Sequence, residues 1–201
     1  ISALGAPIFA PYDPIQLNIM ERLQGPSVNH LLGTDQLGRD LFSRVLFGGQ
    51  VALKVAFLTI GLALIVGIVL GLIAGYGPAW LDNSIMLLFD TIRSVPTIML
   101  ALAAVTVVGP SITTVIFVVA VSSIPPYGRI VRTQTLTLKS KDFVKAEKLM
   151  GASLLRILSI HLLPNILGPL LILASMDIPT VIALEAGLSF LGMGVKPPTP
   201  S

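Results

Sequence analysis

Long apolar runs alternate with short polar stretches along the chain. The longest run, residues 55–76, holds 22 residues without a charge, which is enough to cross a bilayer as a helix. Three further runs cover about 85–108, 112–127 and 166–190. None of them shows the alternation over about ten residues that a membrane β-strand requires. The pattern therefore predicts an all-α fold, a polytopic transmembrane helical bundle with about four spans.

Composition narrows the function classes. The chain is 54% hydrophobic with a mean hydropathy of +0.90, and only 11% of its residues are charged, against roughly 25% in soluble domains. A soluble enzyme and a disordered chain are thereby excluded. The 201 residues contain no cysteine, and His30 and His161 are too far apart in sequence to form a cluster, so we expect no metal site. No phosphate-binding loop and no nucleophile elbow occur, so we expect no catalysis and no cofactor in this chain.

Basic residues are concentrated in one stretch. Residues 128–156 hold seven of the thirteen lysines and arginines and only two acids. The stretch lies between apolar runs, so it indicates a cytoplasmic loop, residues 128–165, and not a nucleic-acid interface. Alternation of the spans then places residues 1–50 outside as an extracytoplasmic polar segment, followed by a transmembrane domain over 51–201. We expect a preceding span to be missing, because a polar segment needs one to carry it across the membrane.

Small residues recur every four positions in the first span: Thr59, Ala63, Gly67, Gly71 and Gly75. On a helix they share one face and allow another backbone to approach closely. This stripe predicts a helix–helix contact, which is either ordinary packing or part of the wall of a pathway.

Ionisable residues inside the spans are a second group of candidates. Asp90 and Arg93 are three residues apart, share a helix face and are predicted to pair. Asp177 and Glu185 lie on roughly one face of the last span, where they would line a cavity, contact another subunit or relay protons. The sequence leaves a structural role and a substrate role open for all four.

The basic stretch contains a helix, a corner and a second helix. The first helix begins near Lys139–Asp142, with Ser140 or Asp142 able to cap it, and ends at Gly151 in the left-handed conformation. Ser153 then caps a second helix that runs to Leu163, before Pro164. Such an apolar and basic element suits docking into a groove of a cytosolic partner.

This element resembles the cytoplasmic "EAA" loop of binding-protein-dependent ABC importer permeases, E-A-A-x-x-x-G followed by I-x-L-P. The chain has Lys145-Ala146-Glu147-Lys148-Leu149-Met150-Gly151 and then Ile160-His161-Leu162-Leu163-Pro164. Lys145 stands where the family has its first Glu. The resemblance implies contact with an ATPase subunit through the following residues: Lys145, Ala146, Glu147, Gly151, Ala152, Ser153, Leu163 and Pro164.

A second block, residues 30–44, resembles the H-x-L-G-T-D-x-x-G-R-D-x-x-S-R pattern of the C-type permease subunit of dipeptide, oligopeptide and nickel importers. Asp13-Pro14 upstream and residues 185–194 downstream also fit. The resemblance covers nearly the whole chain and implies the type I ABC importer permease fold with six spans, of which we expect the first and last to be missing.

The same resemblance implies the partners and the location. They are a homologous permease subunit, two ATP-binding subunits that bind ATP and Mg²⁺, an extracytoplasmic substrate-binding protein and membrane lipid, in a bacterial or archaeal cytoplasmic membrane. Di- or oligopeptides are the expected substrates, with nickel or another small solute as the alternative within the family. An ion-coupled secondary transporter or channel, built on Asp90, Arg93, Asp177 and Glu185, is the alternative outside it.

Overall fold

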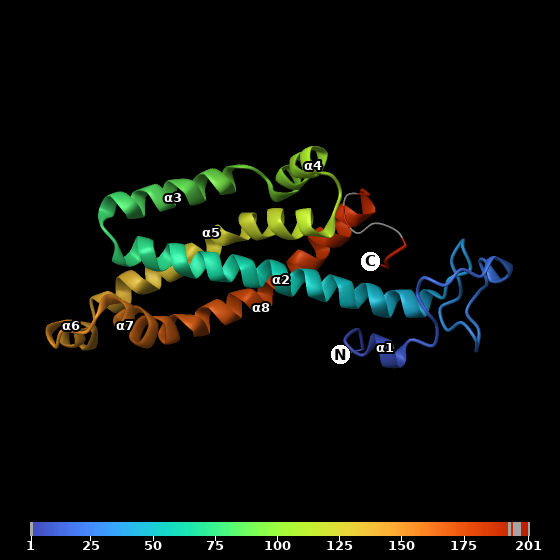
Figure 1. Cartoon of the computed structure of the whole chain (residues 1–201), viewed down its shortest axis with the longest axis horizontal. Helices are drawn as coiled ribbons and strands as arrows, with labels where there is room; N and C mark the ends of the chain where they lie inside the picture. Colours follow the sequence, from blue (N-terminus) through green and yellow to red (C-terminus); the bar gives the residue numbers. More distant parts are fainter. Residues whose placement is uncertain (1, 193, 195–197, 201) are drawn as a thin grey trace. The chain divides into compact units, whose positions relative to one another are not determined.

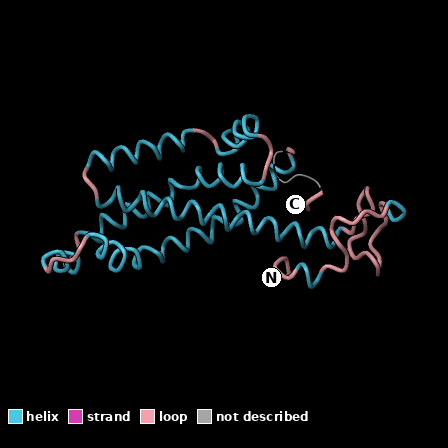
Figure 2. Tube along the Cα trace, viewed as in Figure 1, coloured by secondary structure: helices cyan, strands magenta, loops and turns pink. Residues whose placement is uncertain are grey.

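Helices make up most of the computed structural model (Figures 1 and 2), which describes residues 2–192, 194 and 198–200. The chain divides into two units. Unit 1 comprises Ile1–Phe57, Leu102–Ile116 and Val181–Ser201, and unit 2 comprises Leu58–Ala101 and Phe117–Thr180. Met193, part of the downstream motif, lies outside the described residues.

Among the described residues, three helical segments are long and apolar enough to cross a membrane: α2 (Leu41–Tyr76), α5 (Ile112–Lys139) and the run Leu154–Phe190. That run comprises α7 (Leu154–Arg156), the π-helical turn η2 (Ile157–Leu162) and α8 (Leu163–Phe190). The helices α3 (Ala79–Ser94) and α4 (Thr97–Val108) would form a fourth span together, but they meet at 82°. The expected number of about four spans therefore holds if the bent pair is one span.

The bend between α3 and α4 divides the predicted span over 85–108 into two helices. Val95, the residue before Pro96, is extended, with φ −102° and ψ 128°. A proline disfavours the helical conformation in the residue that precedes it, because its ring collides with that residue's backbone. The proline therefore divides the apolar run into two helices.

The helix of the third span continues beyond the predicted range 112–127, which contains Pro125 and Pro126 near its end. Both prolines lie inside α5, which continues to Lys139. Beyond them Tyr127, Val131 and Thr135 are fully buried. This packing outweighs the loss of two backbone donors. As a result Arg129 and Arg132 belong to a helix, and the first break within the predicted loop 128–165 comes only after Lys139.

The first span starts earlier than predicted. With 36 residues α2 is about 54 Å long, more than the roughly 30 Å of a hydrocarbon core. One end of α2 therefore extends beyond the membrane. In the part of unit 1 that precedes α2, the structure has the short helices α1 (Ala6–Phe9) and η1 (Ile19–Glu21) and a bridge between Thr34 and Asp40.

Unit 2 is built on the contact between α2 and α5. A methyl group on Gly67 would lie 2.7 Å from Cβ of Tyr127, and one on Gly75 would lie 2.6 Å from Cβ of Thr135. The glycine positions let the two backbones approach to a distance that a side chain would prevent. The helix contact predicted from the small-residue stripe is therefore confirmed.

Candidate functional site

The predicted corner between α6 (Asp142–Leu149) and α7 is present in unit 2. Gly151 has φ +80°, in the left-handed region. Its N–H donates to the carbonyl of Lys148 (3.2 Å), and the N–H of Ala152 donates to the carbonyl of Glu147 (3.0 Å). These two bonds form a Schellman motif, which satisfies the last carbonyls of α6 and fixes the direction in which the chain leaves it.

The second helix starts as predicted. The Ser153 hydroxyl accepts from the N–H of Arg156 at 3.4 Å, as an N-cap does. The predicted end at Pro164 is wrong, since the helix passes through η2 and Pro164 into α8. Pro164 has no N–H to donate within the helix, and the side-chain amide of Asn165 donates to the carbonyl of His161 at 2.7 Å. The corner is thus joined to α8 without a loop.

The start of α6 differs from the prediction. Lys141 is the N-cap residue, and no side-chain cap hydrogen bond is made there. Ser140 instead donates to the carbonyl of Thr137, and Asp142 pairs with Lys145 at 3.0 Å. Lys145, which replaces the family's Glu, therefore makes an exposed pair within its own helix.

Glu147 of α6 lies close to His161 of η2. Its carboxylate lies 3.4 Å from Nε2 of His161, and the rings of Phe143 and His161 have centroids 6.5 Å apart. Val144 of α6 and Ile157 of η2 are buried. Of the predicted loop residues, Glu147, Ala152 and Leu163 are half-buried, and the rest are exposed.

Apolar side chains on the outside of the corner are open to solvent. Leu149 is 89% exposed and Leu155 is 76% exposed, and Met150 and Leu154 lie beside them in sequence. We call these four residues the apolar rim. Large exposed apolar patches on a folded element mark sites of interaction.

The predicted pair of Asp90 with Arg93 is wrong. Asp90 pairs with Arg129 of α5, and no ion pair of Arg93 is found among the described residues. The spacing correctly placed the two residues on one helix, but a partner from another helix lies closer to Asp90. That partner is 39 positions away in sequence, where no periodicity could indicate it.

The two acids of α8 each accept a hydrogen bond. The Tyr127 hydroxyl donates to Asp177 at 2.7 Å within unit 2. In unit 1 the Ser189 hydroxyl donates to the buried Glu185 at 2.7 Å. Among the described residues, no group of three or more His, Asp or Glu side chains is placed to hold a metal ion.

A pair that sequence reasoning missed joins α3 to α5. Nε and Nη2 of Arg132 donate to the two carboxylate oxygens of Asp82 at 2.5 and 2.7 Å. Nζ of Lys139 donates to the carbonyl of Gly75 at the end of α2, at 2.7 Å. The sequence alone does not predict this pair, because 50 residues separate Asp82 from Arg132 and no helical spacing relates them.

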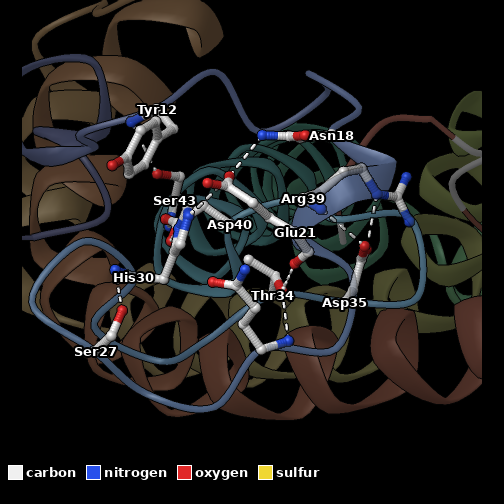
Figure 3. A network of polar contacts seen from close by, with 11 residues as sticks. Tyr12, Asn18, Glu21, Ser27, His30, Thr34, Asp35, Arg39, Asp40 and Ser43 are labelled. Carbon is white, nitrogen blue, oxygen red and sulfur yellow. Dashed lines mark hydrogen bonds and ion pairs between the residues drawn. The ribbon is translucent and has the colours of Figure 1, made fainter.

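The motif at residues 30–44 builds a polar network in unit 1 (Figure 3). Asp40 is at its centre: it accepts from the Ser43 N–H at 2.7 Å, which caps α2, and from His30 Nδ1 at 2.9 Å. His30 Nε2 lies 3.4 Å from a Glu21 carboxylate oxygen, and its ring packs on Tyr12 at 4.9 Å. The network ties the preceding segment to the first turn of α2.

A second carboxylate of the motif organises the turn beside it. Asp35 accepts from the N–H groups of Leu37 (2.8 Å) and Arg39 (3.0 Å) and from Nε of Arg39 (2.7 Å). Gly33 and Gly38 have φ of +78° and +72°, and a side chain at either would meet backbone. The glycines of the pattern are therefore required by the turn itself.

The network sets the charge states of its members. The hydrogen bond to Asp40 raises the pKa of His30 against the opposing effect of burial. Burial raises the pKa of Asp40, but the donors from Ser43 and His30 outweigh it and lower the pKa below its usual value. Each ring nitrogen of His30 faces a carboxylate, an arrangement that suits the doubly protonated imidazolium.

Comparison with known proteins places this chain among transport components. Residues 67–201 match the sequence family described as "Binding-protein-dependent transport system inner membrane component". The dipeptide transport system permease protein DppC of Alkalihalophilus pseudofirmus is 39% identical over 98% of this chain and 65% of its own length. The glutathione transport system permease protein GsiD of Escherichia coli O6:K15:H31 is 42% identical over 100% of this chain and 66% of its own length.

A solved structure shares the fold. It shows inward-facing conformations of the MetNI methionine ABC transporter, with a TM-score of 0.67 and 21% identity over 77% of each chain. The predicted all-α permease fold of the type I ABC importers is thereby confirmed. The chain spans about two thirds of the length of the curated relatives that it matches.

Proposed function

Because the chain belongs to the family of binding-protein-dependent transport system inner membrane components, we propose that it is a permease subunit of an ATP-driven importer. Together with a second, homologous permease subunit it forms the translocation path. The energy comes from two ATP-binding subunits, which hold ATP and Mg²⁺. The element formed by residues 139–164 transmits their motion to the membrane helices.

One observation carries this proposal: the apolar rim lies on a corner whose geometry is fixed by hydrogen bonds and which continues directly into a long helix. The Schellman motif and the Ser153 cap fix the direction of α6 relative to α7. Helical structure continues from Leu154 to Phe190, so a displacement of the corner is carried into α8. Leu149, Met150, Leu154 and Leu155 supply the apolar surface that a groove on a partner would bury.

The charge distribution supports a cytoplasmic position for this element. Five of the basic residues between 128 and 156 lie at or after Lys139 and flank the corner. By the positive-inside rule they face the cytoplasm, where the ATPase subunits are. Residues 1–50 then face outside, where a substrate-binding protein delivers its cargo. The location is the cytoplasmic membrane of a bacterium or archaeon.

Small peptides are the proposed substrates. The relatives named above are dipeptide and glutathione permeases, and both kinds of substrate are short peptides or peptide-like. Nickel or another small solute is the alternative within the family.

Purification of the complex from its own host tests the partners and the substrate class. A tagged chain is solubilised in mild detergent, and co-purifying proteins are identified by mass spectrometry. We expect a homologous permease, two ATPase chains and a binding protein whose extracted ligand is a short peptide. Isolation of the chain without any ATPase, under conditions that preserve known importers, would contradict the proposal.

A further inference from the structure

A half-buried ion pair attaches α3 to α5 in unit 2. Arg132 and Asp82 make two parallel hydrogen bonds, and their side chains are 30% and 16% exposed. A two-pronged arginine–carboxylate contact fixes orientation as well as distance. The second pair between the same helices, Arg129 with Asp90, is far more open, with Asp90 69% exposed. The first pair is thus the stronger attachment, because solvent screens exposed pairs.

The two helices also fit each other closely beside the pair. The ring of Phe89 occupies the space that a side chain on Gly128 would need. Residue numbers rise along α3 in the direction in which they fall along α5, since Asp82 pairs with Arg132 and Asp90 pairs with Arg129. The helices therefore run antiparallel, and α3 lies along the half of α5 nearest the corner.

That half of α5 leads directly into the coupling element. α5 ends at Lys139, and α6 begins at Asp142. The N–H of Lys141 still bonds back to the carbonyl of Leu138 at 3.0 Å, and Lys139 is tied to the end of α2 through the Gly75 carbonyl. We therefore expect a displacement of α6 to move the end of α5 as well, because the connection between them is short and hydrogen-bonded.

We propose that Asp82 and Arg132 are a positioning pair that makes α3 move with α5 when the coupling element moves. The inference rests on the proposed importer function and extends it to a third helix. α3 ends at Ser94, where the chain turns by 82° into α4. Through the pair, the bent segment α3–α4 is therefore displaced when the corner is displaced. Neither residue touches the ATPase or the substrate in this account.

Three variants of the assembled complex test the pair. Asp82→Asn together with Arg132→Gln removes both charges, so no lone charge is left buried and the complex can assemble. The exchange Asp82→Arg with Arg132→Asp restores the attraction in the opposite sense. Asp90→Asn, on the same helix and facing the same partner helix, is the matched control.

The first readout is peptide imported per ATP hydrolysed in proteoliposomes. We expect the neutral double variant to lower this ratio about tenfold while hydrolysis persists, the charge exchange to recover much of it, and Asp90→Asn to keep it. A wild-type ratio in the double variant overturns the proposal. So does an exchange variant that assembles without recovery, or an equal loss in Asp90→Asn.

The second readout separates this proposal from the importer proposal. The 201 residues contain no cysteine, so among them spin labels attach only at Leu87→Cys on α3 and Thr133→Cys on α5, and any cysteine elsewhere in the complex is first replaced by serine. With the native pair we expect the same label distance with and without ATP, and in the neutral double variant a distance that changes with ATP. An unchanged distance in the double variant overturns the proposal. Failure of the native complex to import peptide with ATP contradicts the importer function instead.

Discussion

His30 shows how one side chain can connect a loop to a membrane helix. Its ring bonds Asp40, and Asp40 in turn caps α2 through the Ser43 N–H. The capping bond is typically worth about 1 kcal/mol, and the histidine adds a charged partner that holds the capping carboxylate in place. His30, the first residue of the 30–44 pattern, is therefore the link between residues 21–34 and the start of α2.

This link makes the stability of the segment before α2 sensitive to pH. The folded-state pKa of His30 is raised above the 6.5 of the unfolded chain, so its stabilisation is complete below about 6.5 and is lost as the pH rises through the folded-state value. We expect amide protection factors over residues 24–43, corrected for intrinsic exchange, to be larger at about pH 6 than at about pH 8.5. In His30→Gln the difference should vanish, and its persistence there would refute the assignment.

Gly151 determines the corner through its backbone conformation. A side chain there would meet no atom within 4 Å, so only the positive φ resists substitution. A residue other than glycine costs about 1–2 kcal/mol in this conformation, and asparagine tolerates it best. We expect Gly151→Val to lower import per ATP hydrolysed, and Gly151→Asn to remain close to the native protein. Equal ratios for the two variants would show that the corner does not transmit the motion.

At the scale of elements, the contact of α2 with α5 supports unit 2. A methyl group on Gly71 would lie 2.5 Å from the Gly128 carbonyl oxygen and 2.6 Å from Cβ of Val131. We expect Gly71→Ala to destabilise the complex by about 1–3 kcal/mol, because the helices must separate to admit the methyl group. Thermal unfolding in detergent measures the change.

Gly61→Ala is the control on the same helix. No atom lies within 4 Å of the position that its new methyl group would take. We expect its melting temperature to equal or exceed that of the native protein, since alanine favours helix over glycine. A larger loss at Gly61 than at Gly71 would contradict the packing described for α2 and α5.

The sequence predicted an element best where the conformation depends on residues that are close together in the chain, such as a glycine at a helix end or a serine at a helix start. Gly151 and Ser153 defined the corner, and the small-residue stripe defined the face of α2 that meets α5. Prediction failed where partners distant in the chain decide the outcome. α5 continues through Pro125-Pro126 because its packing outweighs the loss of two backbone donors. Asp90 pairs with Arg129 of α5 and not with its neighbour Arg93. The pair of Asp82 with Arg132 was not predicted, because the two residues are likewise far apart in the chain.

At the scale of the whole molecule, each unit carries a different part of the proposed function. Unit 1 contains the network around Asp40 and His30, and unit 2 contains the proposed coupling element with the pair that attaches α3 to α5. In the proposed importer, residues 1–50 of unit 1 meet the binding protein, and the coupling element of unit 2 meets the ATPase subunits.

Uptake of a radiolabelled dipeptide into proteoliposomes tests the central claim most directly. The vesicles contain the two permeases with or without the ATPase subunits, and the binding protein is added outside. Our account predicts uptake only when the ATPase subunits and internal ATP are both present, and no uptake driven by an ion gradient alone. Gradient-driven uptake at the same rate in vesicles without the ATPase subunits would contradict the account and favour an ion-coupled transporter.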